Sequence, residues 1–169
     1  MIQLSSGFVK ALVSQGPAAD RAVAMALYGQ FIGDWMFDAL VHKDDGGEHR
    51  GRGEIHFSWA LDGRAIQDVW ILPGLFYGTT LRVYDPGIDA WHILWNDPLK
   101  QLYTRQLGRA QGDCIVQMGE QVGDSGNRVH LRWSFSDIAP ESFRWRGERS
   151  PDGGATWHLQ ADFRVRRIS

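Results

Sequence analysis

From Gly33 to the end of the chain, apolar and polar residues alternate with a period of two. The clearest runs span residues 35–41, 55–61, 129–135, 143–147 and 157–165. Successive side chains of a β-strand point to opposite faces of the sheet, so each run predicts a strand with one dry face and one wet face. A chain built from such strands must fold into a mainly β protein that buries one face of an antiparallel sheet.

Turn-forming residues separate these runs at intervals of about ten residues. The turn signals lie at residues 44–47, 62–63, 73–74, 85–87, 97–98, 123–126 and 150–157. Clusters of Asp, Gly and Pro form the tight reversals of β-hairpins. The spacing predicts an up-and-down meander of nine or ten antiparallel strands. Such a sheet can close into a barrel without exposed edges, wide enough to hold one small ligand.

The first part of the chain has a helical pattern instead. Pro17 suits the first turn of a helix, and Val23, Leu27 and Phe31 then recur at a spacing of four residues. Gly33 is expected to end this helix, and residues 4–13 are expected to form a second, shorter one.

The length of 169 residues fits one domain. We therefore expect a single lipocalin-like β-barrel domain over residues 1–169. In it, a helical segment, residues 1–32, closes one end of a barrel formed by residues 33–167.

The composition restricts the partners. The net charge is -2, which gives no reason to expect nucleic acid or a membrane as partner. Cys114 is the single cysteine, so the chain has no internal disulfide. The first residues lack a signal-peptide pattern, and no run approaches the roughly 18 apolar residues of a spanning helix. We expect a cytoplasmic protein whose partner is a small molecule, with a homodimer as a further option.

The segment SPDGGATW, residues 150–157, resembles the Asp-box of sialidase-type propellers. A propeller needs at least roughly four blades of four strands each, more than this chain supplies, and the box occurs once. We interpret it as the turn of the last hairpin, in which the Asp152 carboxylate accepts hydrogen bonds from backbone amides of the loop.

Four elements of the sequence carry a family resemblance. Gly33-Asp34-Trp35 after a helix resembles the G-x-W opening of calycins, the lipocalin and fatty-acid-binding-protein group. ALDGRAIQDVW (60–70), YDPGIDAWHILWND (84–97) and SFRWRGERSPDGGATW (142–157) resemble a bacterial lipocalin-like family of uncharacterised function. The resemblance covers roughly residues 30–167. It implies that Trp35 packs across the closed end of a barrel, and it implies no particular reaction.

Asp68 is the first candidate for chemistry. If Asp62-Gly63 forms a two-residue turn, Asp68 pairs with Phe57 and lies on the same aromatic face. A buried carboxylate needs partners or a changed pKa. Asp68 is therefore a general acid or base, an anchor for a polar group of a ligand, or a structural residue bonded to an Arg, a Trp indole or backbone amides.

His92 is the second candidate. The turns on either side predict that it lies near Leu81 on one neighbouring strand and opposite Arg105 on the other. The alternation here is not clean, so two polar sets compete for the interior. They are His92, Tyr103 and Arg105, or Thr80, Arg82, Thr104 and Gln106.

No other motif indicates a reaction. The six histidines show neither an H-x-H nor an HExxH spacing, so no metal site is predicted. Some fatty-acid-binding-like barrels hold haem through one His, but no motif assigns a His to that role. We therefore predict no cofactor and leave haem binding open. There is no G-x-S-x-G segment, and Cys114 in the apolar run CIVQM is expected to be an inert thiol.

The main hypothesis is a barrel that binds a small apolar or amphipathic molecule. Its predicted site consists of Trp59, Asp68, Trp70, Tyr77, His92, Arg105, Trp133 and Trp145. Whether the protein is an enzyme stays open. One alternative is a small-molecule isomerase, cyclase or hydrolase that uses Asp68 and His92 as acid and base. Another is a barrel packed solid by its own aromatic side chains, which acts through an oligomer interface.

Overall fold

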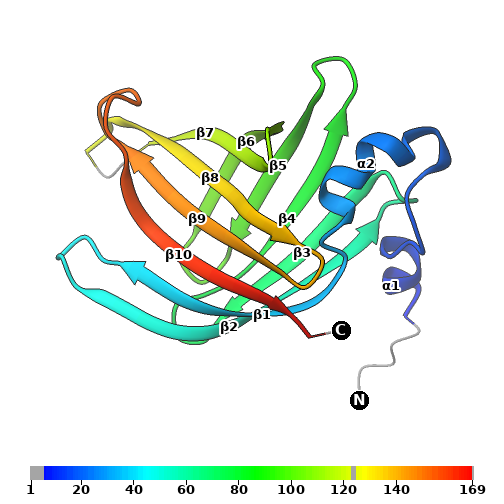
Figure 1. Cartoon of the computed structure of the whole chain (residues 1–169), viewed down its shortest axis with the longest axis horizontal. Helices are drawn as coiled ribbons and strands as arrows, with labels where there is room; N and C mark the ends of the chain where they lie inside the picture. Colours follow the sequence, from blue (N-terminus) through cyan, green and yellow to red (C-terminus); the bar gives the residue numbers. More distant parts are fainter. Residues whose placement is uncertain (1–5, 123–124, 169) are drawn as a thin grey trace.

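Ten antiparallel strands form a closed barrel (Figure 1). The computed structural model describes residues 6–122 and 125–168. The strands are β1 (Gly33–His42), β2 (Glu48–Ala60), β3 (Ala65–Leu72), β4 (Phe76–Asp85), β5 (Ala90–Asp97), β6 (Leu102–Gln111), β7 (Cys114–Val122), β8 (Arg128–Ala139), β9 (Ser142–Ser150) and β10 (His158–Arg167). Each strand pairs with the next in the chain, and β1 also pairs with β10. The predicted up-and-down barrel is thereby confirmed.

Two helices and a 3-10 turn precede the barrel: α1 (Gly7–Leu12), η1 (Ala19–Arg21) and α2 (Ala22–Gly29). Both predicted helices exist but are shorter than expected, and residues 4 and 5 of the first prediction lie outside the described residues. Pro17 precedes η1 instead of starting α2. After Gly29 the chain continues in tight turns, with the N–H of Phe31 donating to the carbonyl of Tyr28. These turns carry Phe31 into the barrel.

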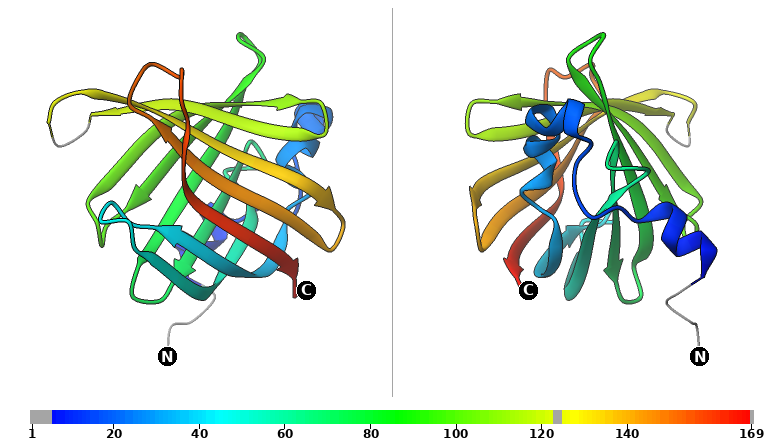
Figure 2. Two further views of the ribbon diagram at one scale, coloured as in Figure 1. Left: turned by 60° about the vertical axis from the view of Figure 1, so that its left-hand side comes forward. Right: turned by 90° about the vertical axis from the view of Figure 1, so that its right-hand side faces the viewer.

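The helical segment covers one end of the barrel (Figure 2). Met25, Tyr28 and Phe31 are fully buried there. Trp35, at the start of β1, is also fully buried, and its Nε1 donates to the carbonyl of Phe31 at 2.7 Å. The guanidinium of Arg167 lies 4.0 Å from the centre of the Trp35 ring, on its face. Trp35 on β1 thus contacts both the helical segment, through Phe31, and the last strand, through Arg167.

The strand registers test the predicted hairpins. Phe57 pairs with Asp68, as the two-residue turn predicted. His92 pairs with Val83 and Leu107, not with positions near Leu81 or opposite Arg105. Both registers are displaced by two residues because the β4–β5 and β5–β6 turns are longer than expected. Because side chains alternate with a period of two, a register shift of two residues leaves each side chain on the face that was predicted for it.

The Asp-box is the turn of the last hairpin, between β9 and β10, as predicted. Oδ1 of Asp152 accepts from the hydroxyl of Ser150 at 2.6 Å and from the N–H of Thr156 at 2.9 Å. Its Oδ2 accepts from the Thr156 hydroxyl at 2.6 Å. Gly153 and Gly154 have φ values of 74° and 93°, which glycine adopts without strain. The turn signal at 123–126 lies partly outside the described residues.

No helix in residues 6–122 and 125–168 is both long enough and apolar enough to cross a membrane.

Candidate ligand-binding cavity

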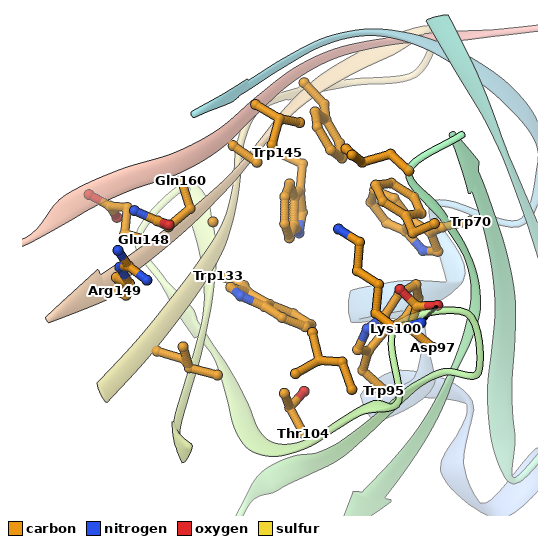
Figure 3. Close-up of a pocket in the computed structure, with 18 of the residues that line it drawn as sticks. Trp70, Trp95, Asp97, Lys100, Thr104, Trp133, Trp145, Glu148, Arg149 and Gln160 are labelled. Carbon is orange, nitrogen blue, oxygen red and sulfur yellow. Dashed lines mark hydrogen bonds between the residues drawn. The ribbon is translucent and has the colours of Figure 1, made fainter. Parts of the chain in front are cut away.

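A cavity of about 520 Å³ opens at the end of the barrel opposite the helices (Figure 3). Its rim consists of the hairpin ends that carry Lys43, Asp44, Leu75, Lys100 and Arg149. The volume falls within the usual range of small-molecule sites. The barrel is therefore not packed solid at this end, which argues against the predicted alternative of a barrel filled by its own aromatic side chains.

Four tryptophans form the wall of this cavity: Trp70 from β3, Trp95 from β5, Trp133 from β8 and Trp145 from β9. The ring centres of Trp70 and Trp145 are 5.4 Å apart, and those of Trp133 and Trp145 are 5.6 Å apart. Phe76, Phe163 and Leu131 complete the apolar lining. Adjacent indoles therefore form a continuous aromatic surface around the opening.

Two inward-facing glycines allow these rings to lie against the wall. A Cβ at Gly78 would lie 2.4 Å from the ring of Trp95, and one at Gly147 would lie 2.9 Å from the ring of Trp145. Both distances are too short for any other residue at these positions without movement of the indole. The glycines thus leave the centre of the barrel open.

A buried ion pair between Asp68 and Arg82 lies at the inner end of the cavity. Oδ1 of Asp68 also accepts from the N–H of Thr80 at 3.1 Å. The Arg82 guanidinium lies 5.1 Å from the ring centre of Tyr28 and 5.5 Å from that of Phe57, on the side of the helices. Burial lowers the pKa of Arg82 to about 10, so the guanidinium is charged at neutral pH. The ion pair separates the aromatic packing under the helices from the cavity.

A hydrogen-bonded chain continues this polar layer across the barrel. The Tyr28 hydroxyl donates to Oε1 of Gln117 at 3.0 Å, and Nε2 of Gln117 donates to Oε1 of Gln106 at 3.1 Å. Burial raises the pKa of Tyr28, an effect that the nearby Arg82 charge opposes. Tyr28 is therefore a neutral donor at physiological pH.

The rim carries charges of both signs, but the carboxylates have local partners. Asp44 pairs with Arg149 at 2.6 Å, and Glu148 accepts from Nε and Nη2 of Arg132 at 2.8 and 2.9 Å. Asp97 accepts from the backbone N–H groups of Leu99 and Lys100. Among the described residues, the ammonium groups of Lys43 and Lys100 take part in no ion pair. The rim therefore offers positive charge to a ligand.

The predicted site residues divide into groups. Trp70, Trp133 and Trp145 line the cavity. Asp68 lies on the inward face, as predicted, but Arg82 and Thr80 occupy its oxygen atoms. Trp59 lies at the helix-covered end, where a Cβ at Gly29 would come within 2.5 Å of its ring.

Tyr77, His92 and Arg105 lie outside the cavity, which corrects their predicted placement. Inward-facing residues of β5 are the buried Trp91, Ile93 and Trp95, so His92, between them, projects from the outer face. Arg105 and Tyr77 likewise alternate with inward-facing residues. Of the two competing polar sets, the interior holds Thr80, Arg82, Thr104 and Gln106.

Asp68 and His92 cannot act together on one bound molecule. They lie on opposite faces of the barrel wall, and Nε2 of His92 is 3.1 Å from Oδ2 of Asp85 at the β4–β5 turn. Within the described residues, no group of three or more His, Cys, Asp or Glu side chains could hold a metal ion.

Trp95 and Lys100 belong to the cavity but were missed by the sequence predictions. Trp91-x-Ile93-x-Trp95 is an apolar alternation that could have identified Trp95 as inward-facing. Lys100 lies in a turn, where no periodic pattern indicates the direction of a side chain.

Comparison with known proteins identifies the fold. No family model and no curated protein matches this sequence. The crystal structure of Rv2717c from M. tuberculosis is similar to this chain, with a TM-score of 0.60 and 12% sequence identity. The match covers 90% of this chain and 99% of that one. At this identity the likeness shows the fold alone.

Proposed function

We propose that this protein is a lipocalin-like carrier or receptor for a small, flat, amphipathic molecule with a negatively charged end. The observation that carries the proposal is the four-tryptophan cavity with the Lys100 side chain extending into it. Figure 3 shows this side chain reaching from the β5–β6 turn into the space bounded by Trp70, Trp133 and Trp145.

The tryptophan wall of the cavity indicates that part of the ligand is apolar. Indole rings bury large areas and stack favourably on flat aromatic groups. Trp70, Trp95, Trp133 and Trp145 provide such surfaces on several sides of one cavity. A flat ring system would replace water on these surfaces, which gives most of the binding free energy.

The charges at the rim of the cavity indicate that the ligand carries a negative group. Asp44, Asp97 and Glu148 already accept hydrogen bonds or ion pairs from neighbouring groups. The side-chain ammonium groups of Lys43 and Lys100 have no such partner among the described residues. A carboxylate or sulfonate on the ligand would supply one to Lys100, beside an apolar surface that strengthens the attraction.

Anilinonaphthalene sulfonate, a fluorescent aromatic anion, provides a direct test. We expect it to bind with one molecule per chain and to quench tryptophan fluorescence. Lys100→Glu should weaken binding about tenfold at low ionic strength, with the effect reduced by salt. Lys10→Glu, which makes the same charge change in α1 at the opposite end, should leave the affinity within about twofold.

A second variant locates the bound probe. Ala161 lines the cavity, so Ala161→Phe should fill part of the space and abolish most of the binding. Equal binding by the wild-type protein, Lys100→Glu and Ala161→Phe would contradict the proposal, because the probe would then occupy another surface. If both variants lose binding as expected, native mass spectrometry of protein purified from its own host would identify the physiological ligand.

A further inference from the structure

Three buried hydrogen-bond donors in the lining of the cavity have no acceptor within the described part of the protein. They are Nε1 of Trp70, Nε of Arg82 and Oγ1 of Thr104. All three residues line the cavity, with exposed fractions of 4%, 2% and 7%. Folded proteins satisfy the great majority of their buried polar groups, because an unsatisfied donor opposes folding. Three such donors in one cavity therefore point to a ligand group that accepts from one or more of them.

The sheet register places these donors near one row of inward-facing residues. In this row, Asp68 on β3 pairs with Thr80 on β4, Thr80 pairs with Trp95 on β5, and Trp95 pairs with Thr104 on β6. Trp70 lies two residues from Asp68 along β3, and Arg82 lies two residues from Thr80 along β4, so both share the inner face with the row. We call the inner surface around this row the floor of the cavity.

Asp68 determines which acceptor fits this floor. Its carboxylate forms a buried ion pair with Arg82, so the positive charge of the guanidinium is already balanced. A second carboxylate at the floor would lose its hydration and would meet Asp68, a group of the same charge. An uncharged oxygen can accept from the remaining N–H and O–H groups without either cost.

We infer that the floor of the cavity is a subsite for an uncharged hydrogen-bond acceptor, such as a ketone or amide carbonyl. This inference rests on the proposed function and specifies its ligand further. The ligand is then a flat aromatic or polyene acid with its anionic group at the Lys100 rim and a carbonyl oxygen at the opposite end.

Three naphthoate probes test the inference, with affinities measured by tryptophan quenching. The first carries an acetyl group at the far end of the ring system, the second an ethyl group there, and the third a second carboxylate. They share the ring system and the rim carboxylate. We expect the acetyl probe to bind about tenfold more tightly than the ethyl probe, and more tightly than the dicarboxylate.

Two conservative variants place the preference at the floor. Thr104→Val removes the hydroxyl, and Trp70→Phe removes the indole N–H while keeping an aromatic ring. Each should reduce the ratio of acetyl to ethyl affinity about threefold or more. Trp157→Phe makes the same change as Trp70→Phe at a residue whose ring stacks on Arg132 outside the cavity, and it should leave the ratio unchanged. Circular dichroism of each variant checks that the barrel is folded.

The outcomes separate this inference from the proposed function. Equal affinity for the acetyl and ethyl probes would overturn the floor subsite and leave the proposed function intact. If the dicarboxylate probe binds most tightly of the three, the inference that the floor prefers an uncharged acceptor is wrong. An acetyl preference that survives in both Thr104→Val and Trp70→Phe would show that the oxygen binds elsewhere. If no naphthoate binds, the proposed function fails and the subsite fails with it.

Discussion

The two ends of the barrel are both aromatic, but one is packed solid and the other is hollow. At the helix-covered end, the ring of Phe31 lies 4.9 Å from that of Phe135 and 4.8 Å from that of Phe143. At the open end, Trp70, Trp95, Trp133 and Trp145 surround a cavity of about 520 Å³. The kind of residue therefore does not decide whether a barrel interior is core or binding site.

The difference comes from what enters the barrel from outside the sheet. The helical segment inserts Met25, Tyr28 and Phe31 into the closed end, where all three are buried. No helix of the described chain covers the open end, and Gly78 and Gly147 allow the indoles there to lie against the wall. One end of the barrel is thus filled because side chains of the helical segment enter it. The other end stays hollow because no such segment enters and the indole rings lie flat against the wall.

Removing an aromatic ring from each end should show the contrast most strongly. Phe31→Ala should lower the free energy of unfolding by about 4 kcal/mol, because the cavity that it creates is surrounded by packed rings. Trp133→Ala should cost only about 1–2 kcal/mol, since Trp133 is half-buried and already borders open space. Urea unfolding followed by circular dichroism measures both. Equal losses would show that the open end also contributes a packed core.

A change in the polar layer between the two ends should have the next largest effect. Asp68→Asn leaves the Arg82 charge buried without its counterion, so it should lower the free energy of unfolding by about 3 kcal/mol. Asp68→Leu combined with Arg82→Met removes both charges and should recover most of that stability. A stable Asp68→Asn protein that has lost only ligand affinity would instead make Asp68 a direct ligand contact.

The smallest effect concerns the rim beyond the cavity, at the Asp-box turn. The Ser150 hydroxyl, followed by the hydroxyl and N–H of Thr156, holds the pKa of Asp152 below its usual 3.8. Because the folded pKa is lowered, this carboxylate stabilises the turn above pH 3.8, and the contribution is lost as the pH falls below that value.

Carbon-detected NMR of the Asp152 carboxyl group measures this titration. Its midpoint should lie below that of an unfolded aspartate, and Ser150→Ala should raise it. A midpoint that is unchanged in Ser150→Ala would show that the hydroxyl does not set the pKa.

The sequence predicted the barrel well because its signals are local. Alternation identifies the strands, and the two-residue turn at Asp62-Gly63 fixed the pairing of Phe57 with Asp68. The β4–β5 register was displaced by two residues because the turn after Asp85 is four residues long, and Asp-Pro-Gly does not specify that length. The helical segment was also shorter than its apolar spacing indicated, since Phe31 enters the barrel from a turn.

The site was less predictable than the fold. Trp70, Trp133 and Trp145 could be placed from alternation, but His92 and Arg105 were assigned to a cavity that they do not face. Both faces of β5 carry large or polar side chains, so the pattern there is ambiguous. The partnership of Asp68 with Arg82 joins different strands and depends on the closed barrel. No local signal encodes it.

The seam between β1 and β10 has a consequence for how the chain folds. Every other pairing joins strands that follow one another along the chain, so these hairpins can form from local contacts. The seam pairs Trp35 with Arg167 and must bring together the two ends of the whole meander. Its formation carries the loop-closure entropy of that meander, which grows only slowly with length. The hairpins of this barrel therefore depend on contacts between chain neighbours, whereas the seam that closes it depends on residues from opposite ends of the meander.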